Sequence, residues 1–350
     1  MSNREIKINS EGVVRLFTVL RFPLICMVVL IHVLQSETYI EDCSSWIHVS
    51  FYLIREAILR SVVPVFFVIS GYMMFMNVNY FDLITYSKKL HRRIYSLLIP
   101  FVLWNLIALI ELLIKHLPCF ENYFPNLKVQ LTLPFFIGTF WAVPEGTCPL
   151  LYPLWYVRDL IVMVLFSPII YWLVKKLRYS FLIILVTLVF SGIKTYPGFS
   201  FSSVLFFSIG IYWTMFFHDK VPPTKSLLPF LILWLPMAYI DTFTQNEMMH
   251  IISILFGVPS LFLLGIMACR HNFSVPNNLT QSVFWILAVH AILLPYIAKI
   301  MFILLHPQNT IFIIFTYFFV WILTVIFSYY TYKFSKKYLP RVNRVLNGGR

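Results

Sequence analysis

Charged residues are scarce in this sequence. Only 12% of its 350 residues are Asp, Glu, Lys or Arg, whereas a soluble globular protein has about 25%. Hydrophobic residues make up 60% of the chain, and its mean hydropathy is +0.81. This composition excludes an ordinary soluble domain. It indicates a polytopic membrane protein whose first partner is the lipid bilayer.

Familiar signatures of catalytic and metal sites are also missing. The chain has no G-x-S-x-G, no Gly-rich phosphate loop and no pair of histidines at metal-ligand spacing. Its five cysteines are too few and too scattered for a disulfide scaffold. The first apolar run is about 20 residues long and no A-x-A site follows it, so it is not typical of a cleaved signal peptide. We expect no metal and no permanently bound cofactor.

What the sequence does contain is a series of long apolar runs without strand alternation. Since only helices and closed barrels can span a bilayer, we expect an all-α membrane fold of about ten helices in a single domain, 1–350. The predicted helices cover residues 14–34, 52–76, 94–115, 151–174, 179–195, 199–217, 227–243, 250–269, 283–304 and 311–333. The apolar run 131–143 is too short to cross and is expected to lie in or along the outer interface.

Basic residues orient this bundle. An even number of helices places both termini on one side, and most of the 27 Lys and Arg fall on that side. They are Arg4, Lys7, Arg15, Lys88, Lys89, Arg92, Arg93, Lys175, Lys176, Arg178, Lys220, Lys225, Arg270, Lys333, Lys336, Lys337, Arg341, Arg344 and Arg350. The positive-inside rule makes that side the cytoplasm. Topology thus explains the net charge of +13, and nucleic acid is not an expected partner.

The predicted first helix carries two ionisable residues, Arg21 and His32. At 100° per residue their separation returns them to one stripe of the helix, with a rise between them of about 16 Å. An arginine at the centre of a membrane helix costs about 2.5–3.5 kcal/mol on insertion scales, so it should face the bundle interior or a wet cavity. The alternatives are that Arg21 snorkels to the headgroups and that His32 is an interfacial residue without a task. Because the two residues share one stripe, we favour the interpretation in which Arg21 binds an anion and His32 is a titratable base.

Five segments, taken in order, carry a resemblance to a known family. They are "LRFPLICMVVLIHV" (20–33), "RSVVPVFFVISGYMM" (60–74), "KKLHRRIYSLLIPFVLWN" (88–105), "PLWYVRDLIVMVLFSPII" (153–170) and "SVFWILAVHAIL" (282–293). Together they resemble the acyltransferase-3 family of integral membrane O-acyltransferases, over residues 11 to 335. Many members have Arg-x-x-Arg before the third helix. Here Ser96 stands three residues after Arg93, and Lys89 with Arg92 gives only Lys-x-x-Arg.

The resemblance implies an enzyme of the bacterial inner membrane that takes an acyl group, usually acetyl, from cytoplasmic acyl-CoA. The acceptor would be a sugar hydroxyl of a surface or lipid-linked glycan. His32 would be the general base, and Arg21 would bind the donor or stabilise charge on its carbonyl. Lys89, Arg92 and Arg93 would bind the phosphates of the donor; a plain positive-inside loop is the alternative. Which of these cations meets the donor stays open.

Other polar residues in the apolar segments are further candidates. Arg158 and Asp159 would lie at the depth of His32, where Asp159 could orient the imidazole and Arg158 could hold the acceptor, or the two could form a structural ion pair. Arg60 could act on the acceptor or pair with Glu56 one turn away. The remaining candidates, each of which could instead be a packing residue, are Glu111 and His290.

Two other functions compete with acyl transfer. A transporter or flippase for a lipid-linked sugar would use the same charges without needing a base. A membrane glycosyltransferase or polymerase could use Glu41 and Asp42 as an acidic motif, although such enzymes usually have large outer loops. On the outer side, a disulfide between Cys119 and Cys148 is an alternative to free thiols, and Cys43 makes the count there odd.

Overall fold

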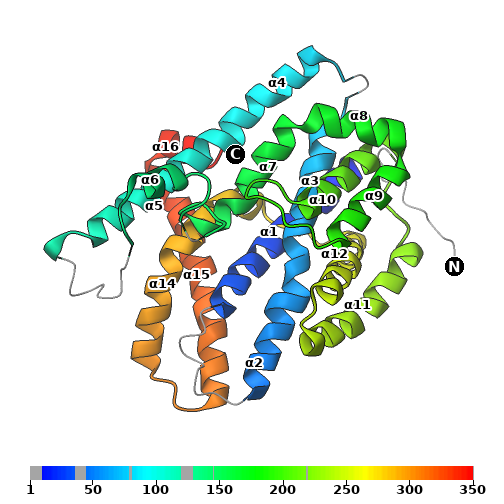
Figure 1. Ribbon diagram of the computed structural model, residues 1–350. Coiled ribbons are helices and arrows are strands. Elements are labelled where there is room, and N and C mark those ends of the chain that lie inside the picture. Colours follow the sequence, from blue (N-terminus) through cyan, green and yellow to red (C-terminus); the bar gives the residue numbers. More distant parts are fainter. Residues whose placement is uncertain are drawn as a thin grey trace.

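The computed structural model describes residues 10–35, 45–78, 81–119, 129–144, 146–217 and 220–349, which form helices and no strand (Figure 1). The elements are α1 (Ser10–Leu34), α2 (Ser45–Tyr52), η2 (Leu53–Ile58), η3 (Leu59–Ser61), α3 (Val62–Phe75), α4 (Leu83–Arg93), η4 (Ile94–Leu98), α5 (Ile99–Lys115), α6 (Leu133–Gly138), η6 (Tyr152–Leu154), α7 (Trp155–Leu165), α8 (Ser167–Leu177), α9 (Tyr179–Phe190), α10 (Phe201–Tyr212), η7 (Trp213–Phe217), α11 (Thr224–Thr244), α12 (Glu247–Arg270), α13 (Asn277–Gln281), α14 (Val283–Leu305), α15 (Thr310–Tyr338) and α16 (Pro340–Leu346). The all-α prediction is confirmed.

Seven continuous helices among the described residues are long and apolar enough to cross a membrane. They are Gly12–Leu34, Trp46–Phe75, Leu83–Lys115, Thr224–Thr244, Glu247–Arg270, Val283–Leu305 and Thr310–Tyr338. The bent pair α7 and α8 would make an eighth span. The helices Tyr179–Phe190 and Phe201–Phe217 are apolar but shorter, and at 1.5 Å per residue neither reaches the ~30 Å of the hydrocarbon core. Each predicted segment thus has a helical counterpart, while ten crossings stay a prediction.

The predicted single helix 151–174 is wrong. In the structure α7 ends at Leu165 and α8 begins at Ser167, with a bend of 66° between them. Pro168, at the start of α8, has no N–H to donate and restricts the residue before it, so it favours a break in the helix at this point. The bend turns the chain away from α7 and lets α8 pack against α9 and α10.

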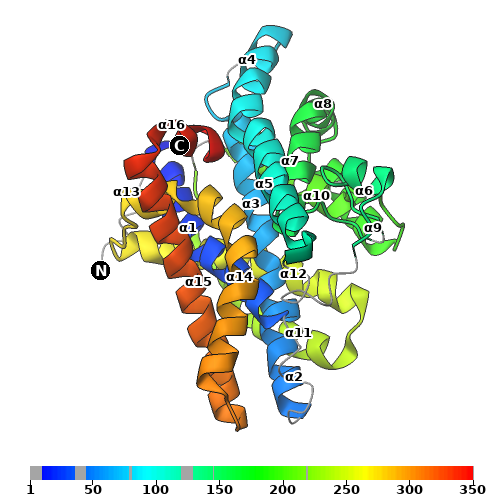
Figure 2. The same ribbon diagram turned by 90° about the vertical axis from the view of Figure 1, so that its left-hand side faces the viewer.

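Helix α1 is the centre of the bundle. It packs against α3, α12, α14 and α15, and Figure 2 shows it between α15 and α3. Because the residues on its packed faces are almost entirely apolar, α1 forms much of the core: Val13, Leu16, Phe17, Leu24, Ile25, Val29, Val33 and Leu34 are at most 1% exposed. The arginine and histidine of α1 therefore lie on a helix that is surrounded by others.

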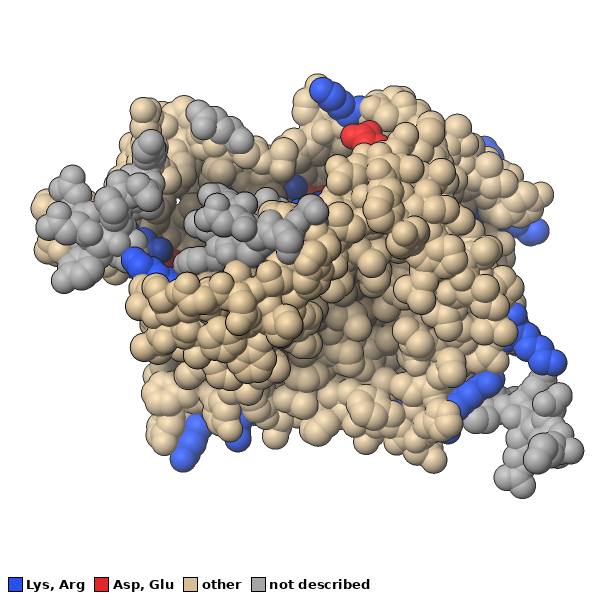
Figure 3. Space-filling view, turned by 90° about the horizontal axis from the view of Figure 1, so that it is seen from below, with Lys and Arg blue, Asp and Glu red and all other residues tan. Residues whose placement is uncertain are grey.

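The two ends of the bundle differ in charge. Helices α4, α8 and α16 and the last turn of α15 lie toward the top of Figure 1, whereas the turn between α14 and α15 and the start of α2 lie at the bottom. The upper elements carry Lys88, Lys89, Arg92, Arg93, Lys175, Lys176, Lys336 and Lys337. We call this the basic end. The opposite face, seen from below, is mostly uncharged over the residues described (Figure 3).

Two glycines allow α3 and α10 to touch along their backbones. A Cβ atom at Gly71 would lie 2.1 Å from the carbonyl oxygen of Phe207, and one at Gly210 would lie 2.1 Å from that of Val68. Small residues at crossing points let membrane helices approach this closely and gain van der Waals contact. The crossing fixes α3, which contributes to the wall of the site described below.

We expect Gly210→Ala to lower the melting temperature in detergent strongly. Alanine favours an isolated helix by about 1 kcal/mol over glycine, but overpacking a tight contact costs about 1–3 kcal/mol or more. Gly192→Ala is the matched control, since its Cβ would meet nothing within 4 Å and only its φ of +68° opposes the change. Equal melting temperatures for the two variants would contradict the close crossing.

Candidate functional site

A cavity of about 850 Å³ runs through the bundle beside α1. The residues that line it along α1 and just after its end include Arg21, Ile25, Val28, His32 and Gln35. Their spacing of four, three, four and three residues is that of one face of an α-helix. Arg21 and His32 thus share one cavity, and their distance along the axis is about 16 Å.

His32 is surrounded by aromatic rings and one amide. Its Nδ1 lies 3.4 Å from Oε1 of Gln35, and the ring of Tyr152 meets it edge-on at 4.7 Å. With the Gln35 oxygen as acceptor, His32 donates from Nδ1, so in the neutral imidazole Nε2 carries the free lone pair. In this tautomer the His32 ring presents Nε2 as the nitrogen able to accept a proton.

His290 stacks against His32 from α14. The two ring centroids are 5.4 Å apart and the planes differ by 26°. Nδ1 of His290 lies 2.8 Å from the carbonyl oxygen of Ile286 and must donate to it, while Nε2 is buried and has no hydrogen-bond partner. The His290 ring thus supports His32 from α14 without itself lining the cavity.

Arg93 is the cation of the α4 cluster that lines the cavity. It is the last residue of α4, and Ser96 and Leu97 of the following π-helical turn η4 line the cavity with it. Of the other two predicted donor residues, Lys89 donates to the carbonyl oxygen of Met76 at 3.5 Å and Arg92 is exposed; neither is among the lining residues. The cavity therefore has Arg21 and Arg93 as its cations toward the basic end.

A second π-helical turn, η2, and the 3-10 turn η3 that follows it bring an ion-pair network to the cavity. Nε of Arg60 donates to Oε2 of Glu56 at 2.6 Å, and Nε of Arg55 lies 2.9 Å from Oε1 of Glu56. Glu56 and Arg60 both line the cavity, and about half of the Arg60 side chain, 52%, is exposed. The one-turn pairing along the helix is present, and π-helical turns are frequent at functional sites.

Arg158 and Asp159 form a structural ion pair instead of lining the cavity. Nε and Nη2 of Arg158 donate to Oδ1 of Asp159 at 3.0 and 2.8 Å, and both residues are at most 4% exposed. Nη1 donates to the carbonyl oxygens of Trp141 and Thr147 at 2.6 and 2.7 Å. The guanidinium thereby fastens the segment 139–151 to α7. The prediction that Asp159 orients His32 does not match this geometry, because the polar partner of His32 is Gln35.

Glu111 also lies outside the cavity lining. It accepts a hydrogen bond of 2.6 Å from the hydroxyl of Tyr296 and pairs with Lys115 at 2.7 Å, which joins α5 to α14. Cys119 and Cys148 are free thiols, so the disulfide considered between them is not formed. Cys43, Glu41 and Asp42 lie outside the described residues.

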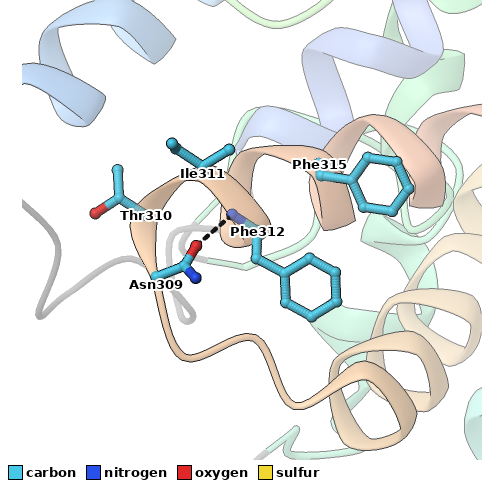
Figure 4. A pocket seen from close by; sticks show the side chains of 5 residues that line it. All are labelled: Asn309, Thr310, Ile311, Phe312 and Phe315. Atoms are coloured by element: carbon cyan, nitrogen blue, oxygen red, sulfur yellow. Dashed lines mark hydrogen bonds between the residues drawn. The ribbon is translucent and has the colours of Figure 1, made fainter.

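A second pocket lacks the ionisable side chains that a catalytic site needs. It has a volume of about 720 Å³ and lies at the start of α15, lined by Asn309, Thr310, Ile311, Phe312 and Phe315 (Figure 4). Oδ1 of Asn309 accepts from the backbone N–H of Phe312 at 2.9 Å, which caps the helix. Its lining has no titratable side chain, so the charged cavity beside α1 is the candidate site.

Several lining residues were not identified by sequence reasoning. Gln35 follows His32 by one helical turn, a spacing that could have indicated it. Tyr152 and Gly348 carry no local signal, because they reach the cavity from η6 and the C-terminal segment. They were missed because their roles depend on how distant helices pack.

We expect Asp159→Asn to lower the free energy of unfolding by about 3–5 kcal/mol, the typical result of breaking a buried ion pair on one side. The charge of Arg158 would then stay buried without its carboxylate. Thermal unfolding in detergent measures the loss. Glu111→Gln is the control, because its ion pair is partly exposed and should cost at most about 1 kcal/mol. Comparable losses of unfolding free energy in Asp159→Asn and Glu111→Gln would show that the ion pair of Arg158 does not hold segment 139–151.

Comparison with known proteins identifies the family. A family model described as an acyltransferase domain matches residues 16–333, nearly the whole chain. Searches of curated proteins and of solved structures gave no match. The matched range contains Arg21 and His32 of α1, both π-helical turns of the site and the helix that carries His290. The chain belongs to the acyltransferase-3 family of membrane acyltransferases.

Proposed function

We propose that this protein is an O-acyltransferase that moves an acyl group, in the simplest case acetyl, from acyl-CoA to a sugar hydroxyl of a surface or lipid-linked glycan. The observation that carries this proposal is a single cavity lined by two arginines toward one end and by His32, on which His290 of α14 stacks. Such a cavity provides separate places for an anionic donor and for proton abstraction within one chamber.

The donor would enter from the basic end. The positive-inside rule supports a cytoplasmic basic end, and coenzyme A, which carries several phosphate charges and does not cross a bilayer, would be met there. The guanidinium of Arg93, at the junction of α4 and η4, is suited to a phosphate group. The pantetheine arm would then extend along α1 past Arg21, and the rise of about 16 Å to His32 is comparable to its length. The thioester carbon would thereby come next to the imidazole.

His32 would act as the general base. Its Nε2 would accept the proton of the sugar hydroxyl while the hydroxyl oxygen attacks the thioester carbonyl. The carbon–sulfur bond would then break, and the CoA thiolate would take up the proton from His32 as the ester leaves. Gln35 and His290 would be positioning residues, because they hold the ring and its tautomer from two sides.

The acceptor would lie against the ion-pair network of η2. Arg60 is half exposed within the cavity while Glu56 holds it in place, so its guanidinium can still donate to sugar oxygens. Thr147, in the segment fastened by Arg158, lines the same cavity. Arg158 and Asp159 would therefore act on the acceptor only by positioning this segment.

We expect His32→Ala to reduce acyl transfer by about 10²–10⁴-fold, the range of general-base catalysis. The measurement is the ester content of surface glycans from cells with wild-type or variant protein at matched membrane abundance. His48→Ala is the control, since His48 is exposed on α2 and is not part of the cavity lining. Unchanged ester content together with reduced glycan export would contradict acyl transfer and favour a flippase.

We expect Arg93→Ala to raise the KM for acyl-CoA by at least about tenfold, because a charge-assisted hydrogen bond contributes about 1.5–3 kcal/mol. Arg92→Ala removes the same charge from the same helix, but Arg92 is exposed and does not line the cavity. Steady-state kinetics at fixed ionic strength give the KM of each variant for acyl-CoA and so distinguish the two substitutions. Equal effects would mean that α4 attracts the donor only through its total charge.

A further inference from the structure

The end of the chain folds back onto the site. Helix α15 ends at Tyr338, Leu339 makes a turn, and α16 follows as a separate short helix. Figures 1 and 2 show α16 near the basic end, beside the long helix formed by α4 and α5, and α16 packs against α5. We call residues 339–348 the C-terminal strap. It lies beyond residue 333, where the match to the family model ends.

Two hydrogen bonds fasten the strap to other parts of the bundle. Nε1 of Trp104, a buried residue of α5, donates to the carbonyl oxygen of Leu346 at 2.9 Å. Nδ2 of Asn347 donates to the carbonyl oxygen of Gln281 at 2.9 Å, and Asn347 is fully buried. The strap thus joins α5 to α13, and its position relative to the cavity is fixed from both sides.

The strap ends as a wall of the cavity. Gly348 is buried, lines the cavity and has a φ of +68°. A Cβ atom on it would lie 2.4 Å from the backbone oxygen of Ser96, and Ser96 itself lines the cavity close to Arg93 in the sequence. Any side chain at position 348 must therefore push against η4 or occupy the cavity.

Packing stability alone does not account for the strap. Nδ2 of Asn343 and Oδ1 of Asn347 are buried and have no hydrogen-bond partner. Unpaired buried polar groups typically cost about 1–3 kcal/mol each, so an apolar segment would hold α5 and α13 together at lower cost. The strap also forms part of the cavity wall through Gly348, and an apolar packing segment without this glycine would not.

We propose that the strap is part of the donor-binding site and that Gly348 is a positioning residue for a CoA-type donor. This inference rests on the proposed function. The bare backbone at Gly348 leaves room beside Ser96 and Arg93 for the narrow pantetheine arm between its phosphate end and the thioester. A side chain at this position narrows the entrance for the donor without touching the stacked histidines, so it acts on donor binding and not on the chemical step.

The neighbouring glycine provides a matched control. Gly349 has a φ of +76°, and a Cβ on it would meet nothing within 4 Å. Asparagine tolerates the left-handed region better than most residues, so Gly348→Asn and Gly349→Asn introduce the same side chain at similar backbone strain. The two variants differ in whether the new side chain meets η4 and the cavity.

The test uses the full chain purified in detergent and measures the dissociation constant of CoA by calorimetry, together with KM and kcat for acetyl-CoA. We expect Gly348→Asn to weaken CoA binding and raise KM by at least about tenfold while kcat changes less than about threefold. Gly349→Asn should stay within about twofold of the wild type. A chain that ends at Asn347 keeps both hydrogen-bond anchors, and it provides the second test if Gly348→Asn lowers the melting temperature.

The outcomes separate this inference from the function on which it rests. Equal CoA binding by the wild type, both asparagine variants and the shortened chain would overturn the role of the strap and leave the acyltransferase proposal intact. A fall in kcat with unchanged KM in Gly348→Asn would also overturn it, since the strap would then act on the chemistry. Failure of the wild type itself to bind CoA would overturn the proposed donor, and the inference with it.

Discussion

The cost of placing ionisable groups inside a membrane helix governs the arrangement of this protein. Arg21 and His32 lie on the central helix, which the rest of the bundle surrounds, and in hydrocarbon a charged side chain is strongly disfavoured. The bundle accommodates both by leaving a cavity of about 850 Å³ along the one stripe that carries them. The apolar remainder of α1 packs against four neighbouring helices. The candidate site is the region of the bundle where the side chains of neighbouring helices do not pack closely against α1.

Irregular helical turns shape the walls of that cavity. Regular α-helices would direct their side chains at fixed intervals, whereas the π-helical turns η2 and η4 shift the register and present Glu56 on one wall and Ser96 on another. The ion pair of Arg158 and Asp159 performs a related task outside the cavity, because it holds the segment that carries Thr147. Polar residues in this bundle thus divide into those that face the cavity and those that fix its walls.

The proposed reaction follows from a separation of charges along the cavity. In that proposal a phosphate-bearing donor would be attracted to the end with Arg93 and Arg21, and the proton would leave the acceptor at His32, beside the rings of His290 and Tyr152. An extended donor can reach from one place to the other without crossing the bilayer. Under the proposed function, one chain would in this way join an acyl group from the basic end to an acceptor that approaches from the opposite side.

Local patterns in the sequence determined the helical class, the approximate extent of the long helices and the shared face of Arg21 and His32, because hydropathy and the 3.6-residue period act within a single element. The family resemblance likewise depended on ordered local motifs. The tertiary structure decided what distant residues do: that Arg93 lines the cavity and Arg92 does not, that His290 stacks on His32, that Arg158 fastens a loop, and that Gly348 meets Ser96. These contacts depend on the crossing angles of helices far apart in the chain, and the local periodicity that predicts each helix contains no information about those angles.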